Sequence, residues 1–247
     1  MSKVWRLIIL NPVDCYTRSA IDEALLRSVG ECKSPNTLRF LSIKPPSVSI
    51  GYLQKIREVV NVEECRKLGI SIARRPSGGG AIYQDFRGEI TYAIVVKAHD
   101  ELISGLDIEE SYRKLLQWLI NALRKIGLNA KYKPPNDIIV NGKKVSGNAQ
   151  SKKYGAVLQH GTILLRTYKD TMARVLKVSK EKIERVTGIE EELRRGIDRK
   201  RIIKLLVESF EKTYNVKLIK GEFTNYEHKL INELRKKYSN PKWIYKR

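Results

Sequence analysis

Residues 74–85 read Arg-Arg-Pro-Ser-Gly-Gly-Gly-Ala-Ile-Tyr-Gln-Asp. An apolar run at residues 70–73 precedes this stretch and a second strand-like run follows the glycines, so no helix begins after them. Three consecutive glycines weaken a strand and exceed what a hairpin turn needs. We therefore expect a bare backbone against which a ligand lies, with Arg75 and free N–H groups facing an anion. A hairpin turn with two solvated arginines is the alternative.

The composition indicates a globular chain with a strongly basic surface. It has 247 residues, 42% of them hydrophobic, and 48 Lys and Arg against 27 Asp and Glu, which gives a formal net charge of +21. An acidic partner, an anionic ligand or nucleic acid is therefore expected. The basic residues are spread along the chain, without a zinc finger, an aromatic ribonucleoprotein motif or a concentrated basic helix, which disfavours a nucleic-acid-binding module.

The cysteines and the N-terminus indicate the cellular compartment of the protein. Cys15, Cys32 and Cys65 form no close pair, and the chain has only three histidines, so a structural zinc site is improbable and a reducing interior fits best. The N-terminus soon becomes a short strand rather than a signal sequence, and no apolar run has transmembrane length. We expect a soluble, cytoplasmic protein that does not associate with membranes.

Hydrophobic periodicity predicts β-strands alternating with helices up to about residue 165. Strands are expected at residues 4–10, 37–43, 47–52, 89–97 and 156–165, and helices at residues 17–28, 60–68 and 108–126. Helices dominate afterwards, at residues 170–178, 198–214 and 224–237, with one strand run at 216–219. This order predicts an α/β or α+β fold. Residues 1–165 would form the α/β body, with residues 166–247 as a mostly helical segment packed on it.

A hairpin closed by Asn-Gly at residues 141–142 carries a second group of candidate residues. Pairing across this turn places Lys144 opposite Ile139. Alternation then puts three polar side chains on one face: Asp137, Lys144 and Ser146. A carboxylate, a lysine and a hydroxyl on one face make a credible site for a phosphate and its metal ion. Lys143 should point the opposite way, and an ordinary surface Asp–Lys pair is the alternative interpretation.

Small and polar residues interrupt two later strand-like runs, at Gly147-Asn148 and at His160-Gly161-Thr162. Glycine inside a strand often marks the close approach of a ligand or of another backbone. These runs therefore extend the candidate site. An ordinary half-buried histidine is an equally good interpretation of His160.

Together, and in this order, these stretches resemble the motifs of the lipoate–protein ligase A family. The matching stretches are residues 74–83, 136–137, 144–150 and 160–162. In addition, residues 22–26 resemble the first helix of the family, and residues 237–243 resemble the end of its catalytic domain. The resemblance covers nearly the whole chain, and the glycine and lysine motifs are specific only in combination.

The resemblance implies a single catalytic domain with the fold of biotin and lipoate ligases, which is a mixed central β-sheet flanked by helices. The implied enzyme uses ATP and Mg²⁺ to convert lipoate to lipoyl-AMP with release of pyrophosphate. It then transfers the lipoyl group to a lysine of an acceptor lipoyl domain. Acceptors of this kind belong to the E2 component of 2-oxoacid dehydrogenases or to the H protein of glycine cleavage.

The resemblance also implies the roles of individual residues. Lys144 would be catalytic, contacting both the carboxyl oxygen of lipoate and the α-phosphate, and Asp137 would hold Mg²⁺. A fixed point charge there lowers the repulsion between two anions that must react. The residues implied to bind ATP or lipoyl-AMP are Arg75, Ser77, Gly78, Gly79, Gly80, Ala81, Ile82, Tyr83, Asn136, Asp137, Lys144, Ser146, Gly147, His160, Gly161 and Thr162.

Two features depart from the family pattern. The family commonly has histidine where this chain has Gln84, and a neutral amide cannot titrate there. Long members of the family carry a small C-terminal accessory domain, whereas this chain stops at Arg247, just past the last motif. We therefore expect no separate accessory domain in this chain and a separate accessory subunit as a partner.

Two related activities are weighed against the ligase. An octanoyl- or lipoyltransferase acting between carrier proteins resembles thioester exchange through a cysteine nucleophile. No cysteine follows Cys65, which lies in a helix-like stretch, so this alternative is disfavoured. A biotin ligase usually alternates Gly and Arg in its motif, unlike residues 74–80. The acyl-chain preference and the identity of the acceptor stay open.

Overall fold

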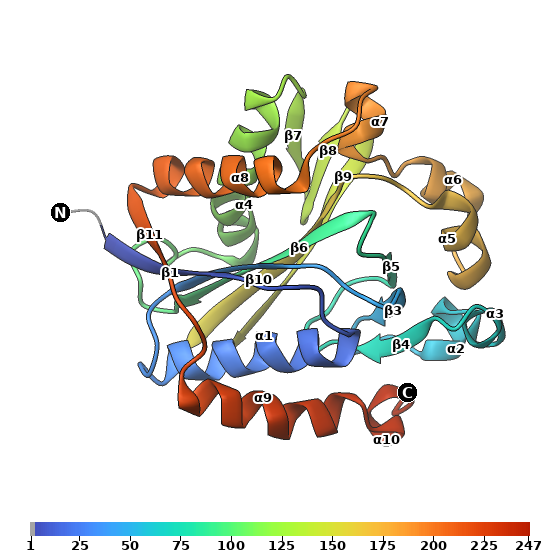
Figure 1. Cartoon of the computed structure of the whole chain (residues 1–247), viewed down its shortest axis with the longest axis horizontal. Coiled ribbons are helices and arrows are strands. Elements are labelled where there is room, and N and C mark those ends of the chain that lie inside the picture. The colour runs from blue at the N-terminus through green and yellow to red at the C-terminus, as the bar shows by residue number, and fades with distance from the viewer. Residues whose placement is uncertain (1–2) are drawn as a thin grey trace.

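One large mixed β-sheet organises the chain, and helices cover both of its faces (Figure 1). The computed structural model describes residues 3–247. From one edge to the other, the strands are β11 (Val216–Lys220), β1 (Lys3–Ile9), β2 (Thr37–Leu41), β6 (Glu89–Lys97), β10 (Ala156–Leu164), β9 (Lys143–Lys153), β8 (Asp137–Val140) and β7 (Ala130–Lys133). The first two pairs are parallel and the others antiparallel. This architecture confirms the predicted fold class.

Each face of the sheet is covered by a pair of helices (Figure 1). Helices α4 (Ile108–Lys125) and α8 (Arg199–Tyr214) pack on one face. On the other face α1 (Cys15–Gly30) packs against the sheet, and α9 (Asn225–Tyr238) packs along α1. In α4 a capping box of Asp107 and Glu110 satisfies the first backbone N–H groups. The apolar stripe of this helix buries Trp118, whose ring meets those of Phe40, Tyr92 and Phe210 edge to face.

A three-stranded sheet beside the main one carries the glycine stretch. Its order is β4 (Ser71–Arg74), β3 (Ser47–Ile50) and β5 (Ile82–Gln84). Two short helices, α2 (Ile56–Val59) and α3 (Val62–Lys67), precede β4 in the chain. The glycines therefore form a loop between two strands, as the sequence predicts. We call residues 75–81 the glycine loop.

The C-terminus secures the strand that leads into the glycine loop. Helix α10 (Pro241–Ile244) lies against β4. The indole N–H of Trp243 donates to the backbone oxygen of Arg74 at 2.9 Å, and the Arg74 Nε donates to the backbone oxygen of Ile244 at 3.0 Å. Because Arg74 is fully buried, these bonds fix the start of the loop.

Residues 166–247 are interleaved with the rest of the fold. They begin with three short helices, α5 (Lys169–Val175), α6 (Lys180–Glu184) and α7 (Ile189–Leu193). After α8, strand β11 joins the main sheet parallel to β1. The short edge strand β7 has no counterpart among the predicted elements, because its lysine-rich sequence lacks a strong apolar pattern. No helix among residues 3–247 is both long and apolar enough to cross a membrane.

A buried ion pair joins the first strand to the last long helix. The guanidinium of Arg6, on β1, donates to the two carboxylate oxygens of Glu227, on α9, at 2.8 and 2.6 Å. Ser34 and the backbone N–H of Thr224 donate to the same carboxylate. Glu227 is fully buried, so removal of its charge would leave Arg6 unpaired.

We predict that Glu227→Ala destabilises the protein by about 3–5 kcal/mol, the usual cost of breaking a buried ion pair from one side. Chemical denaturation followed by circular dichroism measures this change. Glu233→Ala, on the solvent-facing side of the same helix, is the control and should change stability by less than about 0.5 kcal/mol. Equal effects of the two substitutions would show that the buried pair does not hold α9 in place.

Candidate active site

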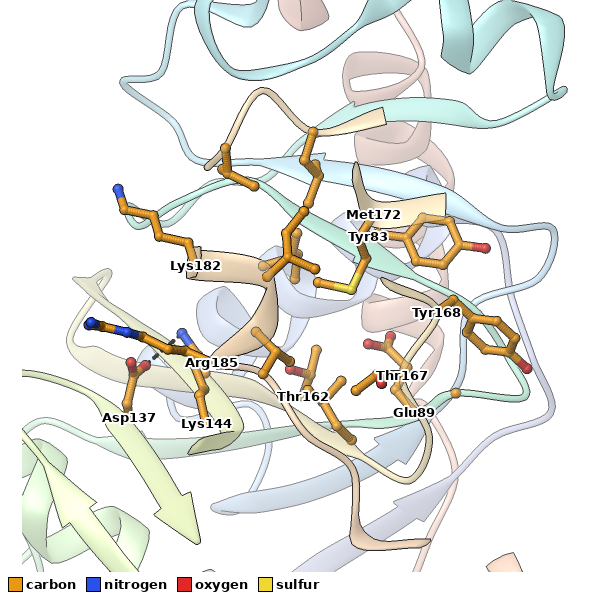
Figure 2. Close-up of a pocket in the computed structure, with 18 of the residues that line it drawn as sticks. Tyr83, Glu89, Asp137, Lys144, Thr162, Thr167, Tyr168, Met172, Lys182 and Arg185 are labelled. Atoms are coloured by element: carbon orange, nitrogen blue, oxygen red, sulfur yellow. Dashed lines mark ion pairs between the residues drawn. The ribbon is translucent and has the colours of Figure 1, made fainter. Parts of the chain in front are cut away.

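An ion pair between Lys144 and Asp137 lies at the centre of the predicted site. The Nζ atom of Lys144 is 2.7 Å from Oδ1 of Asp137, as the dashed line in Figure 2 marks. Lys144 is paired with Ile139 across the hairpin, which confirms the predicted register. Lys143 is exposed and lies opposite Val140, so the geometry favours Lys144 over its neighbour.

The absence of a side chain at Gly147 lets Lys144 reach Asp137. A Cβ atom at position 147 would lie 2.5 Å from Cε and 2.6 Å from Nζ of Lys144. The lysine backbone is also fixed, because its N–H donates to the Arg185 oxygen at 2.7 Å and its oxygen accepts from the Thr187 N–H at 2.9 Å. The segment after α6 therefore clamps the backbone of Lys144.

A β-bulge corrects one part of the hairpin prediction. The register of β8 and β9 shifts between Ile138 and Ile139, so Ser146 lies opposite Ile138. Both of these residues are fully buried, and Ile138 belongs to the core under α4 and α8. The prediction that Ser146 shares a face with Asp137 and Lys144 is therefore wrong. The bulge inserts one extra residue and reverses the side on which Ser146 lies.

The glycine loop presents free backbone donors. No N–H group of residues 78–80 donates a hydrogen bond within the described residues 3–247. The buried guanidinium of Arg75 instead donates to carbonyl oxygens: twice to Gly78, at 3.1 and 2.6 Å, once to Gly80 at 2.9 Å and once to Ser49 at 3.1 Å. Arg75 therefore fixes the shape of the loop, and the free N–H groups of residues 78–80 are the donors that remain available to a ligand.

A buried polar chain holds the glycine loop against the sheet. Asp22, on α1, accepts from Nδ1 of His160 at 2.7 Å, and Nε2 of His160 lies 2.6 Å from the Ser77 hydroxyl. Burial would raise the pKa of Asp22, but the charges of Arg39 and Arg18 and the bond to His160 hold it well below its usual range. Burial lowers the pKa of His160. With Nδ1 donating to Asp22, Nε2 of the neutral ring accepts a hydrogen bond from the Ser77 hydroxyl.

The hydrogen-bonded series Asp22–His160–Ser77 has the residue types of a Ser-His-Asp catalytic triad. The position of Ser77 excludes a role as nucleophile in the present conformation. Ser77 is only 2% exposed, and its hydroxyl is oriented into the protein toward His160. A nucleophile must reach the carbonyl carbon of its substrate. The contact therefore positions the loop, and His160 is a fully enclosed histidine rather than a half-buried one.

A reciprocal pair of amides fixes the entry to β8. The side chain of Asn136 donates to the Asn148 backbone oxygen at 2.5 Å, and the side chain of Asn148 donates to the Asn136 oxygen at 2.8 Å. A Cβ atom at Gly161 would lie 2.0 Å from Oδ1 of Asn148. Gly161 thus leaves space for the side chain that orients Asn136, and with it Asp137.

Two cavities meet at the ion pair. The wide cavity, of about 450 Å³, is bounded by the main sheet, β5 and helices α5 and α6 (Figure 2). The narrow cavity, of about 360 Å³, lies between the glycine loop, the end of β8 and the middle of β10. Six residues line both: Ala81, Ile82, Asp137, Lys144, Gly147 and Thr162. Lys144 and Asp137 therefore stand where a molecule that occupies both cavities would pass.

Most of the predicted binding residues line these cavities. They are Arg75, Gly79, Gly80, Ala81, Ile82, Tyr83, Asn136, Asp137, Lys144, Gly147, His160, Gly161 and Thr162. Ser77, Gly78 and Ser146 line neither cavity. The binding roles of all these residues stay predictions.

The sequence analysis did not find the outer wall of the wide cavity. Tyr168, Met172, Ile183 and Val186 line it, and they come from the segment around α5 and α6. This segment reaches the sheet only through the tertiary fold, and no local motif marks it. Arg18 was missed too, although its position four residues before Asp22 on one helix face offered a signal.

Gln84 connects two buried charges beside the narrow cavity. Its side-chain oxygen accepts from the Arg18 guanidinium at 3.4 Å, and its amide nitrogen donates to Oε1 of Glu89 at 2.7 Å. An amide offers a donor and an acceptor at once, so it can bridge a cation and a carboxyl without titrating. The residue that departs from the family pattern is thus part of a satisfied network.

The cysteines lie away from the cavities. Cys15 and Cys65 are buried in hydrophobic clusters, and burial raises the pKa of both thiols to about 11. Cys32 is exposed at the end of α1. None of the three lines either cavity. The described residues therefore provide no thiolate beside Lys144.

Comparison with known proteins assigns this chain to a family. The family model described as "Lipoyl protein ligase A/B catalytic domain" matches residues 14–211. A curated relative, octanoyltransferase LipM of Moorella thermoacetica, is 32% identical over 274 residues, covering 100% of this chain and 99% of that protein.

Solved structures agree on the fold. A bi-partite lipoate protein ligase from Thermoplasma acidophilum, described together with its E2 lipoyl domain, superposes with a TM-score of 0.88 at 30% identity and covers 98% of this chain and 96% of that chain. A lipoate-protein ligase A bound with ATP has a TM-score of 0.87 at 30% identity, with 99% of each chain covered.

We predict that Gly51→Ala disturbs the glycine loop while the rest of the fold persists. A Cβ atom at Gly51 would lie 2.1 Å from the backbone oxygen of Gly79, so the loop must move. Hydrogen–deuterium exchange of residues 75–84 should increase, with a stability loss of about 1–3 kcal/mol from overpacking. Gly78→Ala is the control, because its Cβ would meet no atom within 4 Å. Identical exchange in the two variants would contradict the prediction.

Proposed function

Because the chain belongs to the lipoyl protein ligase A/B catalytic domain family, we propose that it is an ATP-dependent lipoate–protein ligase. The reaction has two steps: lipoate and ATP form lipoyl-AMP and pyrophosphate, and the lipoyl group then passes to a lysine of an acceptor domain. The observation that carries the proposal is the position of Lys144 at the junction of two cavities. If one molecule were bound in each cavity, the reacting ends of both would meet at the ammonium group of Lys144.

The two cavities differ in the ligand that they suit. Small residues such as Gly79, Gly80 and Ala149 leave the narrow cavity room for a slender acyl chain, beside the buried side chains of Arg18, Arg75 and His160. The rings of Tyr83 and Tyr168 stand beside the wide cavity, 6.4 Å apart and nearly perpendicular, and offer aromatic contact for a nucleobase. We therefore assign the acyl group to the narrow cavity and the adenosine moiety to the wide one.

The first step joins two anions, and the residues at the junction reduce their repulsion. An oxygen of the lipoate carboxylate attacks the α-phosphorus while the bond to the β-phosphate oxygen breaks. Lys144 supplies a positive charge to both reactants, and the free N–H groups of the glycine loop add donors for the developing oxyanion. Asp137 holds the ammonium group in place at 2.7 Å.

The second step needs the same junction. The neutral amine of the acceptor lysine attacks the acyl carbon, AMP leaves as an anion, and one proton is released. Lys144 then stabilises the departing phosphate rather than the attacking carboxylate. One fixed cation thus serves both steps, because the charge that it faces stays on the phosphate oxygens.

The residues fit Mg²⁺ only together with a nucleotide. No cluster of three or more His, Cys, Asp or Glu side chains suited to a metal occurs among residues 3–247. Magnesium commonly takes one or two carboxylates together with phosphate oxygens and water, so Asp137 suffices as a protein ligand. When bound, the ion would neutralise charge on the phosphates.

We extend the proposal to the partners. The formal net charge of +21 suits the docking of an acidic acceptor domain, since complementary charge speeds the encounter. Acceptor lipoyl domains of the E2 or H-protein type are the substrates that we infer. A separate accessory subunit for the activation step is included, because the Thermoplasma acidophilum ligase is described as bi-partite.

Octanoyl transfer between carrier proteins is the second candidate function. It is favoured by the curated relatives that are named octanoyltransferase LipM. The distribution of cysteines speaks against a thioester route through a covalent enzyme intermediate, since none lines a cavity. Acyl transfer from a thioester carrier and pyrophosphate release from ATP distinguish the two candidates directly.

We predict that the chain, with lipoate, ATP and Mg²⁺, releases pyrophosphate and forms lipoyl-AMP. Release by the chain alone would make an accessory subunit dispensable. Transfer from supplied lipoyl-AMP without pyrophosphate release would indicate a catalytic subunit that awaits its partner. Transfer from an octanoylated carrier protein, with neither activity on ATP nor on lipoyl-AMP, would overturn the ligase in favour of the transferase.

Lys144→Ala should lower acyl-adenylate formation by at least about 100-fold, in keeping with the loss of a preorganised charge in the transition state. The protein should fold normally, because Lys144 is partly exposed. Lys143→Ala is the matched control and should retain activity within about twofold, since its side chain lines neither cavity. The same loss in both variants, or in Lys143→Ala alone, would remove Lys144 from its proposed role.

A further inference from the structure

Glu89 is a buried carboxyl group with one oxygen unused. It begins β6 and is only 1% exposed. Its Oε1 atom accepts from Nε2 of Gln84 at 2.7 Å and from the Thr91 hydroxyl at 3.0 Å. Its Oε2 atom is buried and has no hydrogen-bond partner. A buried acceptor without a partner is destabilising, so a ligand that donates to it gains binding energy.

The carboxyl group of Glu89 lies at the wide cavity. Glu89 is one of the residues that line this cavity, and Figure 2 shows its carboxyl group turned toward the side of Met172. Tyr83 and Tyr168 line the same end. An acyl tail would offer this carboxyl no donor, whereas a flat heterocycle with an N–H group at its edge satisfies the carboxyl and the aromatic rings together.

The separation between Glu89 and the Lys144–Asp137 ion pair suits the length of a nucleotide from its phosphate to the edge of its base. Lys144 is on β9 and Glu89 is on β6, and β10 alone separates these strands. Two strand spacings of roughly 4.8 Å each place Glu89 about 10 Å across the sheet from the ion pair. An extended nucleoside monophosphate with its phosphate at Lys144 would bring the edge of its base to Glu89.

We propose that Glu89 selects a 6-aminopurine nucleotide, by accepting a hydrogen bond from the exocyclic amine of the base at Oε2. The inference rests on the proposed ligase function, which places a nucleotide in the wide cavity. A 6-oxopurine would put a carbonyl oxygen against this carboxylate, and two acceptors repel each other. The residue therefore distinguishes ATP from ITP, two nucleotides that differ only at the six-position and the adjacent ring nitrogen.

The substitution Glu89→Gln is a direct test, because its side-chain oxygen can keep the bonds from Gln84 and Thr91 while its amide nitrogen faces the cavity. That nitrogen donates, so it suits the carbonyl oxygen of ITP and not the amine of ATP. Burial raises the pKa of Glu89 to about 7, so binding is measured at pH 8, where the carboxylate form predominates.

The experiment measures dissociation constants for ATP and ITP by calorimetry, with the full chain and Mg²⁺ but without an acyl acid. The wild type should bind ATP at least about tenfold more tightly than ITP, and Glu89→Gln should abolish or invert this preference. Asp85→Asn is the control, because Asp85 lines the same cavity but already accepts bonds from the Arg87 N–H and the Tyr83 hydroxyl. It should leave the ATP-to-ITP ratio unchanged.

The outcomes separate this inference from the proposed function. Binding of ATP with no preference over ITP in the wild type overturns the role of Glu89 and leaves the ligase intact, and this result does not depend on the folding of any variant. An unchanged ratio in a folded Glu89→Gln protein does the same. Failure of the wild type to bind either nucleotide, together with failure to transfer the lipoyl group from supplied lipoyl-AMP, overturns the ligase function and the inference with it.

Discussion

The carboxylate of Asp22 is fully buried, and a charge in that position requires cationic and hydrogen-bonding partners. Arg39, Arg18 and His160 meet this requirement from β2, α1 and β10. Through His160 the network reaches Ser77, and so sets the height of the glycine loop above the sheet. The position of the loop is thus determined from inside the protein, before any ligand is present.

The position of the Lys144 side chain depends on a different constraint, which is the absence of a side chain at Gly147. Gly147 opens the path across β9, and the bulge at β8 and β9 releases the backbone of Lys144 to pair with residues 185–187. A flexible side chain is thereby held between two fixed points, its own backbone and Asp137. Under the proposed function, such restraint reduces the conformational entropy that the long side chain would lose in the reaction.

Local signals in the sequence predicted much of this arrangement. The Asn-Gly turn gave the pairing of Ile139 with Lys144, and β-branched residues marked β6 with the same bounds as in the structure. The face of Ser146 was wrong, because a bulge follows from the twist and packing of the sheet and not from the turn. The outer wall of the wide cavity and the free oxygen of Glu89 arise from tertiary contacts, in which residues that look ordinary in sequence acquire a buried environment.

The two sides of the wide cavity differ in how they can change during evolution. The sheet side carries Lys144, Asp137 and Thr162 on strands whose alteration would disturb the core. The opposite side comes from residues 167–186, a segment of loops and short helices that can accept substitutions and changes of length at little cost to the fold. Under the proposed function, divergence within that segment alters which activated acyl donor fits while Lys144 and Asp137 are retained, so ligases and transferases can share one scaffold.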